Sequence, residues 1–119
     1  MANFYKAGLH PEPVKINTVD SVMPKDVKPN FMLMDVQMVE VEALEGMKET
    51  ISRATDLIIL CEWSGYSIHL TEEEYVVRLR NLLKWFEERK FKFYQTMPKK
   101  KGENMCTKYH FKQLTIAEF

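Results

Sequence analysis

Two unbroken apolar runs set the strongest limit on how this chain can fold. The first, FMLMDV, spans residues 31–36, and the second, LIILC, spans residues 57–61. Neither run alternates apolar with polar side chains, which is typical of strands buried on both faces of a parallel sheet. Both are far shorter than the ~20 residues that a membrane-spanning helix needs. The sequence therefore predicts two buried strands and no contact with a membrane.

The segment between the two runs has the pattern of an amphipathic helix. Leu44, Met47, Ile51 and Ala54 recur at helical spacing, and charged residues fall between them. A strand, a helix and a second strand within about thirty residues form a βαβ unit, which requires parallel pairing and a right-handed crossover. We therefore expect one helix here and a parallel pair of strands around it.

A second helix is predicted after the loop EWSGYSIH. Thr71 and Glu74 have the spacing of a capping box and mark its start. An apolar stripe runs from Tyr75 to Phe86, and the pattern ends near Arg89. Two substantial helices are few for a doubly wound sheet, which normally has both faces covered.

The two ends of the chain predict simpler structure. Residues 91–95 and 107–113 read as two strands of an antiparallel hairpin, because the linker between them contains the turn-forming stretch PKKKGEN. Its three lysines, residues 99–101, are expected to be a solvated loop tip rather than a phosphate site. At the other end, residues 1–14 read as a loose arm and residues 14–20, VKINTVD, as a short edge strand. Residues 15–119 are expected to form one domain.

Composition narrows the class of protein. Seventeen basic residues balance seventeen acidic residues, so no net charge attracts the chain to nucleic acid or to an anionic membrane. Two cysteines are too few for a disulfide framework and favour a reducing compartment. Because the first residues also lack the apolar core of a signal peptide, we expect a cytoplasmic protein.

The stretch FMLMDVQMVEVEALEGM, followed by DLIILCEW, resembles the motif region of the FkbM-type methyltransferases, which use S-adenosylmethionine. In that family a strand ends in Lys-x-Asp-Val-Glu-Gly-x-Glu, a Leu-x-Gly follows, and the next strand ends in Glu. Upstream, the family has a Thr-Leu-Asp segment. The matching positions in this chain are Asp35, Val36, Glu40, Leu44, Gly46 and Glu62, with Thr18 and Asp20 upstream. The resemblance covers residues 17–94.

The chain also departs from that pattern. Leu33, Gln37 and Met38 stand where the family motif has Lys, Glu and Gly. The family holds its cofactor on a glycine-rich loop, and the four glycines of this chain are widely separated. The resemblance therefore implies an α/β fold that is the C-terminal half of a Rossmann-like methyltransferase sheet, parallel at its centre with an antiparallel hairpin. It implies little S-adenosylmethionine binding by the isolated chain.

The resemblance further implies transfer of a methyl group to an oxygen of a small or sugar-like acceptor. Ligands bind at the carboxyl ends of strands in open α/β sheets. By residue, the expected catalytic groups are Asp35, Glu62 and Glu40, and the expected substrate-binding groups are Thr18, Asp20, Gln37 and Trp63.

Plainer interpretations of the same residues stay open. Asp35 is also a suitable cap for the following helix, Glu62 a solvated loop residue, and Glu40 an acid that stabilises a helix dipole. No metal site is expected, because Cys61 with His69 and Cys106 with His110 offer isolated pairs only. The chain could equally be a non-catalytic interaction or oligomerisation module, completed by a second copy or a partner, or the remnant of a gene.

Overall fold

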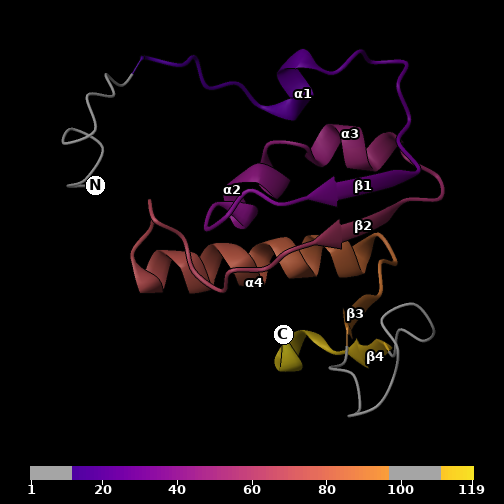
Figure 1. Cartoon of the computed structure of the whole chain (residues 1–119). Helices are drawn as coiled ribbons and strands as arrows, with labels where there is room; N and C mark the ends of the chain where they lie inside the picture. Colours follow the sequence, from indigo (N-terminus) through magenta and orange to yellow (C-terminus); the bar gives the residue numbers. More distant parts are fainter. Residues whose placement is uncertain (1–11, 97–110) are drawn as a thin grey trace, which may run out of the picture.

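The computed structural model describes residues 12–96 and 111–119 (Figure 1). Its elements run in the order α1 (Val19–Val22), β1 (Phe31–Met34), α2 (Glu40–Glu45), α3 (Lys48–Arg53), β2 (Ile58–Cys61), α4 (Glu72–Glu88), β3 (Phe93–Thr96), β4 (Phe111–Leu114) and the 3-10 turn η2 (Ile116–Glu118). It is a small α/β protein with one parallel pair of strands and one antiparallel hairpin. That coarse class was predicted from the sequence.

The parallel pairing of β1 with β2 is confirmed. The register runs from Phe31 opposite Ile58 to Met34 opposite Cys61. The two strands are shorter than the apolar runs, because Asp35, Val36 and Leu57 lie outside them. The connection between them returns through α2 and α3, as a parallel pair requires.

Only one face of this sheet is covered, so the prediction of strands buried on both faces is wrong for the described residues. Met32, Met34, Ile59 and Cys61 pack against the core formed with α2, α3 and α4. The intervening side chains form an uncovered surface that we call the open face. Its members and their exposed fractions are Phe31 (57%), Leu33 (68%), Ile58 (66%) and Leu60 (47%). The reason is that the apolar side chains of α2, α3 and α4 pack on the other face.

The single helix predicted between the strands is two helices. α2 ends at Gly46 and α3 begins after Met47. The Asp20 backbone amide donates to the Gly46 carbonyl oxygen at 3.0 Å, so the segment before β1 is inserted at the break. A Cβ atom at Gly46 would lie 3.3 Å from the Thr18 side chain. No local pattern of residues indicates this contact between distant segments.

The edge strand predicted at residues 14–20 is absent. Residues 12–18 have no regular structure, and α1 follows with Thr18 as its N-cap. Val14 and Ile16 are 82% and 93% exposed, because no described strand lies beside them to receive their side chains. Alternating apolar residues form a strand only where such a neighbour exists.

The second predicted helix is confirmed at both ends. The Thr71 hydroxyl accepts from the Glu74 amide at 3.2 Å, and Glu74 Oε2 accepts from the Thr71 amide at 2.8 Å, which completes the capping box. At the other end, the Phe91 amide donates to the Phe86 carbonyl and the Lys90 amide to the Glu87 carbonyl. These two bonds define a Schellman motif, and Lys90 takes the left-handed conformation with φ 65°.

An aromatic chain attaches the C-terminal hairpin to α4. The Phe86 ring lies edge-on to Phe91, with centroids 5.0 Å apart, and to Phe93 at 6.4 Å. Phe93 in turn meets Phe119 at 5.7 Å. Pairing of Phe93–Thr96 with Phe111–Leu114 confirms the predicted hairpin, while residues 97–110, including its turn, the three lysines, Cys106 and His110, lie outside the described residues.

No helix among the described residues is both long and apolar enough to cross a membrane. α4 is the longest, with 17 residues, and one side of it is exposed and charged.

The left-handed residue after α4 gives a first prediction. We expect Lys90→Gly to raise the free energy of unfolding by roughly 1 kcal/mol, because a side chain in this conformation costs about that amount and Lys90 is exposed. Urea denaturation followed by circular dichroism measures it. The matched control is Lys84→Gly in the interior of α4, which should lower the free energy of unfolding by about 1 kcal/mol. A loss of stability in both variants would contradict the assignment.

Candidate functional site

The carboxyl ends of β1 and β2 bring two of the expected catalytic acids to one edge. Asp35 and Glu62 are the residues that directly follow the paired positions Met34 and Cys61. The Glu62 amide donates to the Met34 carbonyl at 3.0 Å, so the parallel ladder continues to this point. Both acids are exposed, and neither side chain forms a hydrogen bond or an ion pair with another described residue.

Cys61, the last residue of β2, packs its side chain against the core. Burial raises its pKa to about 11, and the charges of Glu40, Asp35 and Glu62 act in the same direction. A thiol with this pKa stays protonated near neutral pH and is a poor nucleophile. Cys61 is therefore a packing residue on the covered face of the sheet, next to the edge where Asp35 and Glu62 stand.

Glu40 differs from the other two acids because it is buried. Its residue is 1% exposed and stands in the first turn of α2, where stabilisation of the helix dipole was the plainer interpretation. Glu40 Oε1 accepts from the Met38 amide at 2.9 Å and from the Ser64 hydroxyl at 2.8 Å. Glu40 Oε2 has no hydrogen-bond partner among the described residues. A buried carboxylate oxygen of this kind is costly, and it is uncommon away from functional or switch positions.

Ser64 joins the loop after β1 to the loop after β2. Besides donating to Glu40, its hydroxyl accepts from the Met38 amide at 3.0 Å. The Ile68 amide adds a bond to the Met38 carbonyl at 3.1 Å. Sequence reasoning missed Ser64, since a lone serine in a loop carries no signal of a partner 24 residues away.

This junction holds two residues in the left-handed conformation. Gln37 has φ 43° and Met38 has φ 68°, which side chains rarely adopt. Glycine is the residue best suited to this conformation, and Met38 takes it with a full side chain. Gln37, an expected substrate-binding residue, is exposed beside it.

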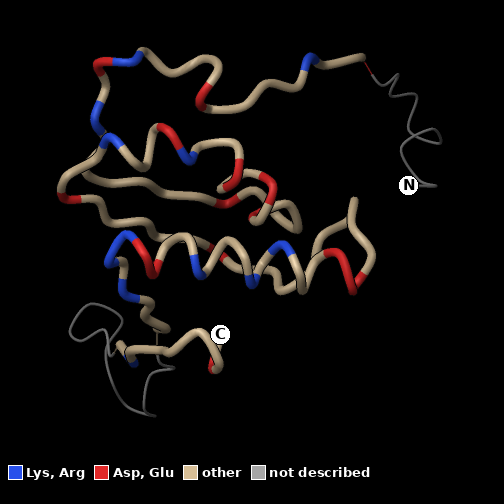
Figure 2. The backbone as a smooth tube through the Cα atoms, turned by 180° about the vertical axis from the view of Figure 1, so that it is seen from behind, with Lys and Arg blue, Asp and Glu red and all other residues tan. Residues whose placement is uncertain are grey.

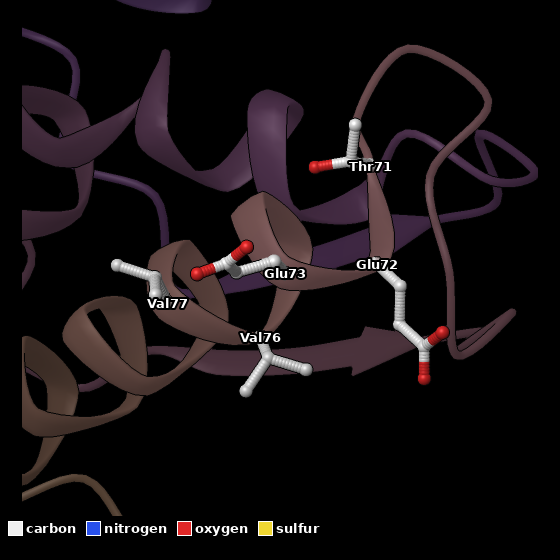
Figure 3. Close-up of a pocket in the computed structure, with 5 residues that line it drawn as sticks. All are labelled: Thr71, Glu72, Glu73, Val76 and Val77. Atoms are coloured by element: carbon white, nitrogen blue, oxygen red, sulfur yellow. The ribbon is translucent and has the colours of Figure 1, made fainter.

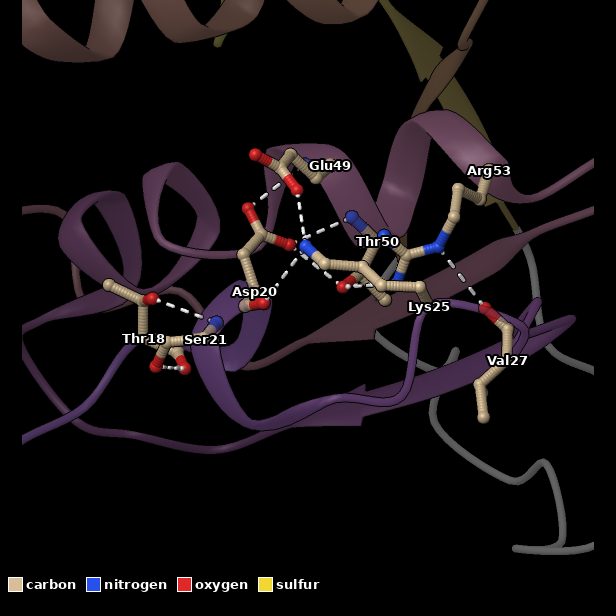
Figure 4. A network of polar contacts seen from close by, with 8 residues as sticks. All are labelled: Thr18, Asp20, Ser21, Lys25, Val27, Glu49, Thr50 and Arg53. Atoms are coloured by element: carbon tan, nitrogen blue, oxygen red, sulfur yellow. Dashed lines mark hydrogen bonds and ion pairs between the residues drawn. The ribbon is translucent and has the colours of Figure 1, made fainter.

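Thr18 and Asp20, also expected to bind substrate, are engaged in helix caps (Figure 4). The Thr18 hydroxyl accepts from the Ser21 amide at 3.2 Å. Asp20 Oδ2 accepts from the Glu49 amide at 2.9 Å, and Asp20 Oδ1 accepts from the Thr50 amide and hydroxyl, both at 2.8 Å. Burial alone would raise the pKa of Asp20, but these hydrogen bonds outweigh it and the pKa is lowered.

Trp63 is half-buried and anchored rather than open. Its ring meets Phe119 edge-to-face, with centroids 5.1 Å apart. It also neighbours the buried Tyr75, whose pKa is raised mainly by burial and further by the charges of Glu40 and Glu42.

Asp35 is not the cap of the following helix, because α2 has Val39 as its N-cap and no side chain caps it.

Two hollows of the described surface lie away from these acids. One is a wide, shallow depression on the first turns of α4, lined by residues 71–73, 76 and 77 (Figure 3). The other has a volume of about 280 Å³ and lies between residues 65–70 and the start of α4, against Tyr75. Neither is lined by Asp35, Glu40 or Glu62.

The described residues do not fit S-adenosylmethionine in the way the family binds it. Gly46 packs against Thr18, and Gly65 stands in a loop with open space around it. No glycine-rich turn follows β1 or β2. Within the same residues, no three histidine, cysteine or acidic side chains are arranged to hold a metal ion.

The capping role of Asp20 predicts a pH-dependent loss of stability. We expect Asp20→Asn to lower the free energy of unfolding by about 1–2 kcal/mol at pH 7, because the carboxylate caps two amides of α3. Since the folded pKa is depressed, this contribution is complete above the unfolded pKa near 4 and is lost as pH falls through the folded value. Urea titrations at several pH values measure it. A difference between the two proteins that stays constant down to the lowest pH would contradict the cap.

The Ser64 junction gives a second stability prediction. Ser64→Ala should cost roughly 1–3 kcal/mol, because Glu40 and the Met38 amide lose a partner in a part-buried site. Ser52→Ala on the exposed side of α3 is the control and should change stability by less than about 0.5 kcal/mol. Equal effects of the two substitutions in thermal unfolding would count against the junction.

Comparison with known proteins gives no assignment. No protein-family model, curated protein or solved structure matches this chain. The likeness to the FkbM-type methyltransferases therefore stays a prediction from the sequence.

Proposed function

We propose that this chain is an FkbM-like α/β module that provides the acceptor-binding edge of an S-adenosylmethionine-dependent O-methyltransferase. The observation that carries the proposal is the placement of Asp35 and Glu62 side by side at the carboxyl ends of two parallel strands, with the buried Glu40 in the first turn of α2 after the loop that follows β1. This edge is where open α/β sheets bind their ligands. The acceptor class that suits exposed carboxylates is a small molecule with several hydroxyl groups, such as a sugar.

In this proposal the three acids have different tasks. Asp35 and Glu62 are exposed and free of protein partners within the described chain, so they accept hydrogen bonds from acceptor hydroxyls. Glu40 is buried and held by Ser64, so it positions the turn at Met38 that carries the chain away from β1. S-adenosylmethionine would be the methyl donor. Because the described residues contain no fitting glycine-rich turn, we expect the donor to bind to a partner or to further sequence.

The test uses the 119-residue protein and two probes. Titration calorimetry with S-adenosylmethionine should give no heat of binding, and micromolar affinity would overturn the placement of the donor on another surface. A ¹H–¹⁵N NMR titration with methyl α-D-glucoside should shift the amides of residues 35–38 and 62–64. The Asp35→Asn/Glu62→Gln double variant should lose these shifts.

Asp56→Asn is the matched control for that titration, because Asp56 is an exposed acid just before β2, at the opposite end of the strand. It should leave the shifts unchanged. Shifts that are scattered over the molecule, or that survive in the double variant, would contradict an acceptor site at this edge.

A second candidate function is association with another protein, in which this chain is a non-catalytic interaction module. The open face favours it, because four large apolar side chains of one sheet are about half exposed or more. Monomeric proteins rarely leave such a surface uncovered unless it binds something.

A further inference from the structure

The open face is a surface that the proposed acceptor site does not use. It consists of two cross-strand pairs, Phe31 with Ile58 and Leu33 with Leu60, and it contains no polar or charged side chain. Parallel sheets are found almost only where both faces are covered. The strands themselves, FMLM and IILC, also lack the charges, prolines or bulges with which proteins protect exposed sheets. Both observations indicate that another element covers this face.

The size of the open face indicates what kind of element can cover it. Two strands about 4.8 Å apart and four residues long give a surface roughly 10 by 13 Å across, allowing for the side chains. One α-helix is about 10 Å wide and covers that length in some nine residues. The same surface is far smaller than the ~800 Å² that each partner of a stable dimer buries. A single helix fits it, and a second copy of the chain packed by this face alone does not.

The charges at one end of the open face indicate in which direction a covering helix would run. Along each strand the side chains alternate between faces, and Asp35 and Glu62 come next on the side of Leu33 and Leu60. Both carboxylates lack a partner among the described residues. A helix whose N-terminus lies here brings the positive end of its dipole to two negative charges.

The covered face already has this arrangement. In Figure 1 the β1 and β2 arrows point one way, and α4 runs back in the opposite direction from the carboxyl edge. The first turns of its helices are acidic, with Glu40 and Glu42 in α2 and Glu72, Glu73 and Glu74 in α4. A helix on the open face would repeat the direction, with the acids supplied by the strand ends.

We propose that the open face docks one amphipathic helix of a partner protein. The helix runs antiparallel to β1 and β2, its apolar side lies on Phe31, Leu33, Ile58 and Leu60, and its N-terminal turn lies against Asp35 and Glu62. Such a helix completes the second layer of the sheet. The proposal goes beyond the acceptor site, since the four side chains of this face act by packing and not by contact with a hydroxyl ligand.

The test uses fluorescence anisotropy with two labelled 18-residue helical peptides. Both carry one stripe of leucines and a polar remainder; one has two lysines in its first turn and the other has two glutamates there. We expect both to bind the 119-residue protein, the lysine peptide more tightly. Leu33→Lys should weaken binding of both by roughly ten-fold or more, because it places a charge in the centre of the contact.

Val77→Lys on α4 is the matched control, because Val77 is 50% exposed and apolar but lies outside the open face. It should leave both affinities unchanged. The Asp35→Asn/Glu62→Gln variant should abolish the preference for the lysine peptide while both peptides still bind. Absence of binding, equal losses in Leu33→Lys and Val77→Lys, or a preference that survives in the double variant would overturn the proposal.

Sedimentation velocity tests whether a second copy of the chain, rather than a partner helix, covers the open face. The protein alone should sediment as a monomer, and Leu33→Lys should leave its sedimentation coefficient unchanged. A dimer that Leu33→Lys dissociates would assign the open face to a second copy of the chain and would overturn the helix.

Discussion

Parallel pairing of β1 with β2 is the constraint on which the rest of the molecule depends. Parallel neighbours cannot be joined by a tight turn, so the chain has to return across the sheet between them. That return is α2 and α3, and its apolar residues make the core with α4. The same pairing brings both carboxyl ends to one edge, which is why Asp35 and Glu62 become neighbours although 26 residues lie between them in the sequence.

Buried polar contacts stabilise the loops at the carboxyl edge of the sheet. Glu40 and Ser64 close the two loops over Met38, and they hold Gln37 and Met38 in a conformation that side chains avoid. Local strain of this kind persists only where surrounding contacts determine the backbone, and it is concentrated at functional positions. The Asp20 carboxylate accepts three hydrogen bonds, but these join α1 to α3 and stabilise the break between α2 and α3. Its task is structural.

The carboxyl edge of the sheet and the open face give the molecule two surfaces for binding. Figure 2 shows acidic and basic residues interspersed along the backbone, so a ligand is selected by local groups and not by an overall field. At the edge, two free carboxylates suit hydroxyl groups or the N-terminus of a helix. On the open face, four apolar side chains suit a packed helix. The two proposals share only Asp35 and Glu62, which is why variants of Leu33 separate them.

By itself the sequence determined the elements whose information is local. The apolar runs predicted the parallel strands, and Thr71 with Glu74 predicted the start of α4, because capping and periodicity depend on residues a few positions apart. It also placed Asp35 and Glu62 at strand ends. Only the tertiary structure decided which face of the sheet is covered, that Asp20 divides one expected helix into two, that no strand of the described chain pairs with Val14 and Ile16, and that Glu40 is buried against Ser64. Each of these depends on contacts between segments far apart in the chain, which no local pattern of residues records.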